Sequence, residues 1–322
     1  MSSTQIAVER IEAPRVRLLD LTREYQELRG ELLAACERVL DRMQLLGGDE
    51  VKQFEAEMAD YLGTPHVRGV ASGTDALRLG LSALGIGRDD EVLIQANAYV
   101  AAVEAIWSLG ARPIAVDIRE DDLGPDPEQL AAAVTPRTRG ILVVHLYGLP
   151  VDMDPLMALA RDQELAVVED CSHAHGATLD GRSVGTFGGV GAFSLGVVKN
   201  LAAYGDAGLV CSADEAVVAR VRHLGTHGQV RKNEHAFYGT NSRLDELHAA
   251  LLRVKLRHLD ARNARRRAIA AHYSERLRHV VDVPFTEPRR EPVYHQFVIR
   301  TAERDELRAH LAAGDIDSGI HY

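Results

Sequence analysis

The sequence predicts an α/β fold in which helices cover both faces of a doubly wound, mostly parallel sheet. Between residues 67 and 212, short runs rich in Val, Ile and Leu alternate with longer segments of helical periodicity, an order typical of parallel sheets. The apolar runs are nearly continuous and do not alternate with polar residues, so we expect both faces of the sheet to be buried. With 322 residues, the chain can form this domain and a smaller second one.

The predicted elements follow one another in a regular order. Two amphipathic helices fill residues 20–62, with Gly47 and Gly48 between them and Asp49 as the N-cap of the second helix. Residues 243–279, downstream of the sheet region, have the composition of long helices. Strands are expected at 67–71, 91–95, 112–117, 140–146, 165–170 and 189–193.

The C-terminal part of the chain has the pattern of a smaller α+β domain. One strand is expected at 294–301 and one helix at 303–314. We therefore divide the chain into the N-terminal helices with the α/β domain, residues 1–258, and the start of a small domain, residues 259–322. One strand and one helix are too few to close such a domain, so it is expected to be incomplete at the C-terminus.

The composition excludes several classes of partner. The net charge of −10 disfavours a broad surface for nucleic acid or for anionic membranes, and the basic cluster at 262–267 is expected to be the solvated face of a helix. The three cysteines have no C-x-x-C spacing, so neither a disulfide framework nor a zinc knuckle is supported. The N-terminal segment lacks the apolar core of a signal peptide, and no apolar run has the length of a membrane span. We expect a soluble, cytoplasmic protein.

Polar and reactive side chains follow the predicted strands. In open parallel sheets, ligands bind at the carboxyl ends of the strands, where helix N-termini converge. The sequence therefore predicts a ligand site at this edge. The residues that follow the strands are Ser72, Gly73, Thr74, Asn97, Tyr99, His145, Asp170, Ser194 and Lys199.

Lys199 and Asp170 together predict a pyridoxal phosphate site. Lys199 follows the apolar run AFSLGVV, so burial is expected to lower the pKa of its amine and to make it available for Schiff-base formation. A carboxylate at a neighbouring strand end keeps a pyridine nitrogen protonated. Glu169 competes with Asp170 for this role, but side chains alternate along a strand, and we assign the role to Asp170.

The other residues at this edge each have an ordinary alternative. Ser72, Gly73 and Thr74 begin a predicted helix, where they bind a phosphate or form a simple N-cap. Tyr99 stacks on a flat cofactor or packs in the core. The turn DCSHAH, residues 170–175, has metal-binding residue types, but no second Cys/His cluster and no HExxH motif supports a metal, and we expect none.

With these residues in hand, the chain resembles the DegT-type sugar aminotransferases, which depend on pyridoxal phosphate and belong to the fold type I aminotransferases. The resemblance runs from end to end. It rests on LLGGDEVKQFEAEMADYLG, ASGTDALRLGLSALGIGRDDEVL, VHLYGLPVDMD, VEDCSHAHGA, the FS…KNL segment and YGTNSRLDELHAALLRVKL, in this order.

The resemblance implies a role for each site residue. Lys199 matches the lysine that binds the cofactor covalently, and Asp170 matches the aspartate paired with the pyridine nitrogen. His173 matches the Gln or His near the phenolic oxygen, and Tyr99 the aromatic that stacks on the ring. The phosphate contacts fall on Gly73, Thr74 and Ser194, and on Asn241, which in the family reaches the phosphate of the other subunit. A homodimer with shared active sites is therefore implied.

The implied activity is transamination. An amino acid, by family expectation L-glutamate, donates the amino group to a keto group of a nucleotide-linked keto sugar, in amino-sugar or antibiotic biosynthesis. Three alternatives stay open: a keto-cyclitol acceptor, a noncatalytic regulatory protein that binds pyridoxal phosphate, and a dehydratase of the same fold. Dehydratases have His at the position of Lys199, which disfavours the last of these.

The chain also departs from the family pattern around Lys199. The residues before the lysine are Gly196, Val197 and Val198, where a small or hydroxyl residue is usual. Where the family usually has GDGG, this chain has GDAG at residues 205–208, with Ala207 in place of the second glycine. Gln95 stands where the family frequently has a proline. None of these changes removes a catalytic group, but they leave the substrate fit open.

Overall fold

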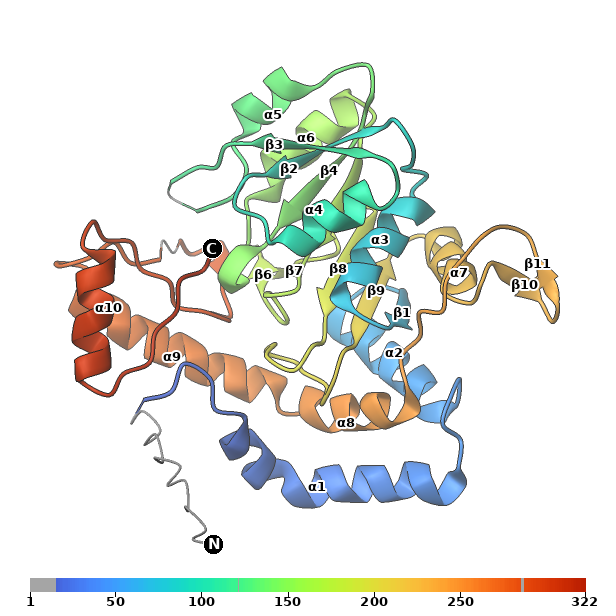
Figure 1. Cartoon of the computed structure of the whole chain (residues 1–322), viewed down its shortest axis with the longest axis horizontal. Coiled ribbons are helices and arrows are strands. Elements are labelled where there is room, and N and C mark those ends of the chain that lie inside the picture. Colours follow the sequence, from blue (N-terminus) through green and yellow to red (C-terminus); the bar gives the residue numbers. More distant parts are fainter. Residues whose placement is uncertain (1–15, 121, 285–286) are drawn as a thin grey trace, which may run out of the picture.

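A seven-stranded sheet forms the centre of the protein (Figure 1). The computed structural model describes residues 16–120, 122–284 and 287–322; most of the N-terminal segment considered above, residues 1–15, lies outside this range. The strand order is β1-β9-β8-β5-β4-β2-β3. The strands are β1 (His66–Val70), β2 (Glu91–Gln95), β3 (Arg112–Val116), β4 (Thr138–Val144), β5 (Ala166–Asp170), β8 (Val190–Ser194) and β9 (Gly208–Ser212).

The sheet is mostly parallel, which confirms the predicted fold class. The pairs β3–β2, β2–β4, β4–β5 and β5–β8 are parallel. Strand β9 pairs antiparallel with both β8 and β1, so it alone runs in the opposite direction. The carboxyl ends of the other six strands therefore meet at one edge, together with the amino end of β9.

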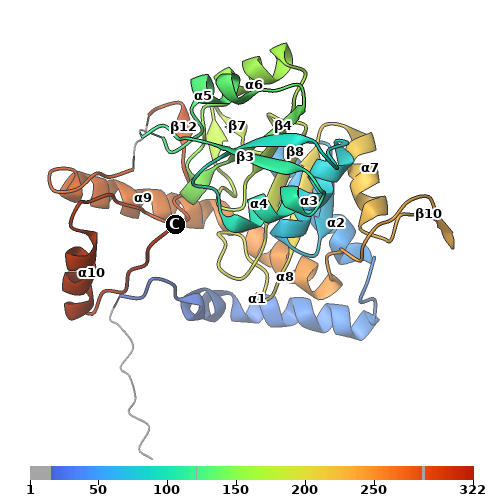
Figure 2. The same ribbon diagram turned by 45° about the horizontal axis from the view of Figure 1, so that its top comes forward.

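Helices cover both faces of the sheet (Figures 1 and 2). On one face, α3 (Gly73–Ala83), α4 (Val100–Trp107) and α7 (Glu215–Leu224) share a core with Val92, Ile94 and Val210 of the strands. On the other face, α2 (Asp49–Leu62) and α8 (Glu246–Leu256) pack on Phe193 and Leu209, while α5 (Pro127–Ala133) and α6 (Met153–Asp162) pack on Leu93 and Ile141. Val92 and Leu93 thus face opposite layers, as strand alternation requires.

The two N-terminal helices are present, but the predicted cap of the second helix is wrong. Helix α1 (Leu21–Arg42) packs along α8, and α2 begins at Asp49 with Gly48 as its N-cap. The capping acceptor comes from far away in the sequence: the buried Glu246 carboxylate accepts hydrogen bonds from the Gly48 N–H at 2.5 Å and the Glu50 N–H at 2.9 Å. Asp49 is therefore the first residue of the helix.

The C-terminal part contains the long helix α9 (Leu259–Leu277) and the predicted helix, α10 (Arg304–Ala313). The predicted strand at 294–301 is wrong: within the described residues, this stretch forms an isolated bridge between Arg300 and Asp282, and the Gln296 N–H donates to the Tyr147 carbonyl oxygen, but no ladder is formed. An apolar, β-branched run does not make a strand without a neighbouring strand to pair with. The division into domains at residues 258 and 259 stays a prediction.

Smaller elements surround this framework. A short hairpin, β10 (Gln229–Arg231) with β11 (Glu234–His235), projects away from the body of the protein (Figure 2). Strand β12 (Arg290–Glu291) joins β6 (Thr178–Leu179) and β7 (Arg182–Ser183) in a second small sheet, and η1 (Leu146–Gly148) follows β4. In the described residues, no helix combines the length and the apolar character that crossing a membrane requires.

The basic cluster at 262–267 is not simply a solvated helix face. Arg262 forms ion pairs with Glu24 and Glu27 of α1. Arg266 donates to the Tyr294 carbonyl oxygen, and Arg267 pairs with Glu291. Three of the cluster's arginines therefore fix α9 to other parts of the chain.

Candidate active site

Ser72, Gly73 and Ser194, three of the predicted phosphate-binding residues, come together at the carboxyl edge of the sheet. Val70 and Ser194, the last residues of β1 and β8, both pair with Gly208. A Cβ atom on Gly73 would lie 2.5 Å from the Ser194 Cβ, and one on Gly208 would lie 2.2 Å from the Ser72 carbonyl oxygen. Both glycines are thus needed for the close approach of the helix α3 N-terminus to the ends of β8 and β9.

The start of α3 offers donors for an anion. The Ser72 hydroxyl caps the helix by accepting a hydrogen bond from the Asp75 N–H at 3.1 Å. The first N–H groups of a helix have no partner within the helix, and the helix dipole favours negative charge there. Thr74 is exposed at this end, and Ser194 lies against Gly73. This arrangement fits a phosphate group.

Asp170 and Lys199 are electrostatic partners at the same edge. Asp170 is the last residue of β5, is 6% exposed, and accepts a hydrogen bond from the Ser172 N–H at 3.0 Å. Burial raises the pKa of the Asp170 carboxyl, and its hydrogen bonds with Ser172 and the charge of Lys199 oppose this shift. Burial lowers the pKa of the Lys199 amine, and the charge of Asp170 opposes this shift. The amine is thus placed for carbonyl chemistry.

The neighbouring carboxylate, Glu169, has a different set of partners. Its oxygens accept hydrogen bonds from the Gly185, Phe187 and Gly188 N–H groups, each at 2.7 Å. The other contact is with His145 Nε2 at 3.0 Å. Glu169 therefore fixes the loop before β8, and it is Asp170 that lies near Lys199.

His145 follows strand β4, as predicted, but its side chain is buried against Glu169 and does not lie among the proposed cofactor contacts. Its Nδ1 accepts a hydrogen bond from the Val151 N–H at 3.0 Å, so its Nε2 carries the proton that is donated to Glu169. A metal site needs several His, Cys, Asp or Glu side chains close together. Within the described residues, the one such group of three is His145, Glu169 and Cys171, whose potential ligand atoms lie within 4.8 Å of one another. Burial raises the pKa of the Cys171 thiol well above its ordinary value. The group is satisfied by hydrogen bonds and keeps a protonated thiol, a poor metal ligand.

His173 is held as a neutral hydrogen-bond donor. Its Nδ1 accepts a hydrogen bond from the Tyr147 N–H at 3.2 Å, so the proton of the neutral ring is on Nε2. Burial is the main cause that lowers the pKa of His173 to about 3. The Nε2–H can therefore donate to an oxygen of a bound molecule.

Aromatic rings line the site. Tyr99 is 51% exposed, and its ring centroid lies 5.3 Å from that of Tyr322. The rings of Tyr147 and Tyr322 each lie 6.4 Å from the ring of His173, and the His295 ring lies 4.4 Å from it. Sequence analysis did not identify Tyr147, His295 or Tyr322. Tyr147 belongs to the motif VHLYG, which is part of the family resemblance and could have indicated this residue.

Asn241, the remaining predicted phosphate contact, lies on the surface of the protein. Its side chain is exposed, and its backbone forms an isolated bridge with Thr226. The next residue, Ser242, accepts a hydrogen bond from the Ala71 N–H at 3.1 Å.

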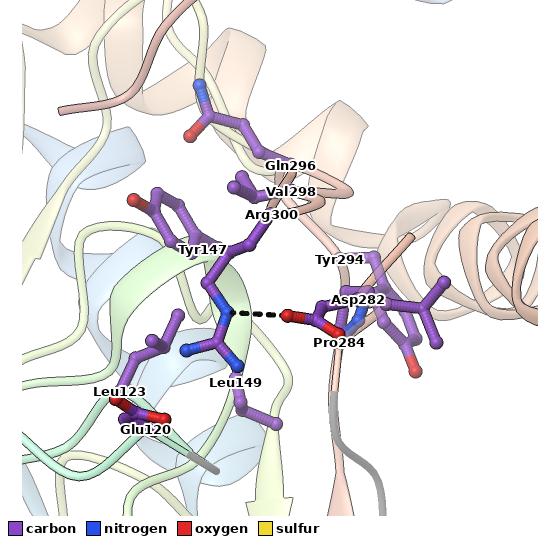
Figure 3. Close-up of a pocket in the computed structure, with 11 residues that line it drawn as sticks. Glu120, Leu123, Tyr147, Leu149, Asp282, Pro284, Tyr294, Gln296, Val298 and Arg300 are labelled. Atoms are coloured by element: carbon purple, nitrogen blue, oxygen red, sulfur yellow. Dashed lines mark ion pairs between the residues drawn. The ribbon is translucent and has the colours of Figure 1, made fainter. Parts of the chain in front are cut away.

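Tyr147 also lines a cleft (Figure 3). It has an empty volume of about 500 Å³, part of it open solvent. Leu123, Leu149 and Val298 give it apolar walls, and the ion pair between Arg300 and Asp282, 3.9 Å apart, spans it.

The residues at the edge fit pyridoxal phosphate. They supply an amine for its aldehyde, a carboxylate for its ring nitrogen, an N–H donor for its phenolic oxygen, and a helix N-terminus with hydroxyl groups for its phosphate. The family model described as DegT/DnrJ/EryC1/StrS aminotransferase family matches residues 26–322. The chain belongs to this family. This confirms the predicted resemblance, and the protein is an aminotransferase that depends on pyridoxal phosphate.

Several characterised proteins are similar along nearly the whole chain. A dTDP-3-amino-3,4,6-trideoxy-alpha-D-glucose transaminase of Streptomyces venezuelae is 48% identical over 315 residues, which are 97% of this chain and 83% of the relative. The erythromycin biosynthesis sensory transduction protein EryC1 of Saccharopolyspora erythraea is 44% identical, over 95% of this chain and 84% of the relative.

The solved structures agree with this assignment. The crystal structure of S. venezuelae DesV in complex with a ketimine intermediate has a TM-score of 0.94 and 48% identity, and the match covers 96% of this chain and 84% of that one. NtdA of Bacillus subtilis with bound cofactor PMP has a TM-score of 0.87 and 29% identity, over 92% of this chain and 69% of that one.

Proposed function

We propose that this aminotransferase moves an amino group from an amino acid, with L-glutamate as the first candidate, to a keto group of a nucleotide-linked sugar in amino-sugar or antibiotic biosynthesis. The observation that carries the proposal is the pair formed by the half-buried Lys199 and the buried Asp170 at the carboxyl edge of the sheet. The sugar acceptor is supported by the relatives, which include dTDP-sugar transaminases of Streptomyces venezuelae and of Micromonospora megalomicea subsp. nigra, the second 42% identical.

Lys199 is proposed as the group that binds the cofactor and moves protons. Pyridoxal phosphate supplies an aldehyde that condenses with amines and a ring that withdraws electrons. Because burial lowers the pKa of Lys199, its Nζ loses a proton more readily than an exposed lysine does. A neutral Nζ would hold the cofactor through its aldehyde carbon, with release of one water, and as a free amine would accept a proton from the amino donor and return it.

The remaining site residues are proposed to hold the cofactor. The Asp170 carboxylate accepts a hydrogen bond from the protonated ring nitrogen, and His173 Nε2–H donates to the phenolic oxygen. Ser72, Gly73, Thr74 and Ser194 hold the phosphate through hydroxyl and backbone N–H groups. Tyr99 stacks on the ring, in keeping with its exposed position at the start of α4.

We also propose a cytoplasmic homodimer in which Asn241 reaches the phosphate bound by the partner subunit. The exposed position of Asn241 supports this. Loops that carry site residues also expose large apolar side chains: Tyr99, Val100, Val197, Val198 and Tyr204. A second subunit would bury such groups. The free cysteines Cys36, Cys171 and Cys211 suit a reducing compartment.

The first experiment follows the cofactor absorbance. L-Glutamate is added to the purified protein loaded with pyridoxal phosphate, and the band of the lysine-bound cofactor is expected to disappear. A panel of nucleotide keto sugars is then expected to restore the band and yield an amino sugar. Keto cyclitols form a separate arm, and restoration by these alone would replace the sugar acceptor. If no amino donor changes the band, the protein is a regulatory binder of the cofactor and the proposal fails.

A further inference from the structure

Asn200, the residue after Lys199, connects three separate parts of the chain. Its Nδ2 donates to the Asn263 Oδ1 on α9 at 3.1 Å and to the Val293 carbonyl oxygen at 3.2 Å. Its Oδ1 lies 3.1 Å from His295 Nδ1. One short side chain thus joins the Lys199 loop to α9 and to the segment that follows β12.

These contacts fix the tautomer of His295. Asn200 Nδ2 is the donor in its two other bonds, so Oδ1 is the acceptor toward His295. His295 Nδ1 must therefore carry a proton, and in the neutral ring Nε2 has the free lone pair. This is the opposite tautomer to that of His173.

The ring held in this way packs against the site. The centroid of the His295 ring lies 4.4 Å from that of His173, which donates toward the proposed cofactor. Asn263 closes the connection from the other side, because its Nδ2 donates to the His175 carbonyl oxygen at 2.8 Å. His173 and His175 belong to the turn that follows Asp170.

We propose that Asn200 and His295 act as a pair of positioning residues, which fix the loop of Lys199 and the ring of His173 relative to Asp170. The pair touches neither the cofactor nor the substrate in this role. The inference rests on the proposed function of Lys199, but its geometry is independent of the identity of the amino acceptor.

The charged surroundings of His295 favour this positioning role. The charges of Lys199 in its loop and of Arg266 on α9 disfavour a positive charge on His295, and His173 and His175 in the turn after β5 would do so only if protonated. Burial, the main cause, lowers the pKa of His295 well below its ordinary value. The ring of His295 therefore stays neutral. Its Nδ1–H is then its one hydrogen-bond donor, and this donor is directed at the Asn200 Oδ1.

The test compares four variants of the full chain with one control. Asn200→Ala removes all three bonds of the amide, His295→Leu removes the bond to Asn200 together with the ring contact to His173, and the third variant combines the two. In His295→Asn, the amide nitrogen can take the place of Nδ1 and restore the donor. His310→Asn, on the exposed face of α10, is the matched control.

The first measurement needs no activity. The pH dependence of acylation of Lys199 in the cofactor-free protein, followed by peptide mass spectrometry, reports the pKa of the amine. In Asn200→Ala and His295→Leu it is expected to rise toward that of an exposed lysine, because the loop is released to solvent. His295→Asn and His310→Asn are expected to behave as the wild type.

The second measurement uses the protein loaded with pyridoxal phosphate. The rate constant for loss of the absorbance band with L-glutamate is expected to fall by roughly 10- to 100-fold in Asn200→Ala and His295→Leu, because reacting groups are misplaced. The concentration of glutamate at half-maximal rate should change little. The combined variant should lose less than the product of the two single losses, since the two residues share the bond between Asn200 Oδ1 and His295 Nδ1.

The outcomes separate this inference from the proposed function. Wild-type acylation profiles in Asn200→Ala and in His295→Leu would overturn the positioning pair, as would a failure of His295→Asn to behave better than His295→Leu. If His295→Leu does not fold, Asn200→Ala and His295→Asn decide the question alone. If the wild type shows no absorbance change with any donor, the proposed function fails, and the acylation profiles still decide the role of the pair.

Discussion

At the scale of single residues, burial determines the charge of the groups at the sheet edge. Burial raises the pKa of Asp170 and lowers those of Lys199 and His173, so each group is shifted toward its neutral form. The attraction between Asp170 and Lys199 opposes this in both groups. A bound cofactor with a protonated ring nitrogen would give Asp170 a second cationic partner and favour its carboxylate form.

The sequence identified Lys199 and Asp170 because each follows a recognisable strand and carries a reactive group. His295 was not identified, since it was assigned to a strand and its contact with His173 depends on how the C-terminal segment packs. Tyr147 was missed for the same reason: its backbone N–H fixes the His173 tautomer, a contact that no spacing in the sequence encodes.

Replacement of Lys199 tests the proposed chemistry directly. Lys199→Ala is expected to fold and to keep the noncovalent cofactor contacts, but to lose transamination by at least about 10³-fold, because the proton-transferring amine is gone. The measurement is the rate of amino-product formation. Lys52→Ala, an exposed lysine on α2, is the control. Turnover of Lys199→Ala within a few-fold of the wild type would contradict the assignment.

Asp170→Asn separates function from stability. Burial raises the pKa of Asp170 in the folded state above its value in the unfolded chain. The contribution of this carboxyl to the free energy of unfolding is therefore fully present below the unfolded-state pKa, and it is lost as the pH rises through the folded-state pKa. Asn has no charge to bury and keeps an acceptor for the Ser172 N–H. The cofactor-free variant is therefore expected to be more stable than the wild type at pH 7 to 8 and nearly equal at pH 3, with transamination lost.

Urea unfolding at both pH values checks this, with Asp41→Asn on the exposed side of α1 as the control. An equal stability difference at both pH values would show that the Asp170 charge carries no burial penalty. Near wild-type transamination by Asp170→Asn would count against its pairing with the ring nitrogen.

At the scale of elements, local pattern predicted the parallel strands and most helix positions, but not features that depend on distant partners. The apolar runs at 91–95 and 165–170 coincide with or overlap β2 and β5. The reversed direction of β9 follows from its pairing with β1 and β8, which its own residues do not encode. The cap of α2 is a similar case, because Glu246 supplies it from the start of α8.

Glu246→Ala is expected to destabilise the protein through α2. The substitution leaves the Gly48 and Glu50 N–H groups without their acceptor at a buried position, at a cost of about 1–3 kcal/mol in the free energy of unfolding. Glu246→Gln keeps one acceptor oxygen and should cost less. Urea unfolding gives the values, with Glu306→Ala on exposed α10 as the control. Equal stability of Glu246→Ala and the control would show that solvent caps the helix equally well.

At the scale of the whole molecule, the proposed homodimer assigns Asn241 to the phosphate site of the partner subunit. The strand edge gathers the other predicted phosphate contacts, whereas Asn241 is exposed beside Thr226. The proposed second subunit would cover both Asn241 and the apolar side chains exposed around Tyr99 and Val198. In the proposed closed, symmetric dimer, each subunit would both give and receive an asparagine.

Mixing two impaired variants tests the shared site. Lys199→Ala removes the reactive amine, and Asn241→Ala removes the proposed phosphate contact. In a mixed dimer, the subunit that keeps Lys199 would receive an intact Asn241 from its partner, so one of the two sites would be wild type. With random exchange of equal amounts, half of the dimers are mixed, and the activity should approach about a quarter of the wild-type value.

The alternative arrangement gives a different result. If Asn241 served its own subunit, the mixed dimer would pair a site without lysine with a site without asparagine, and neither would be intact. The activity of the mixture would then equal the mean of the two variants measured separately. Unfolding and refolding the variants together ensures exchange, and mixing each variant with itself is the control. Because Asn241→Ala can keep partial activity, the decisive quantity is the excess of the mixture over that mean, and its absence would overturn the shared site.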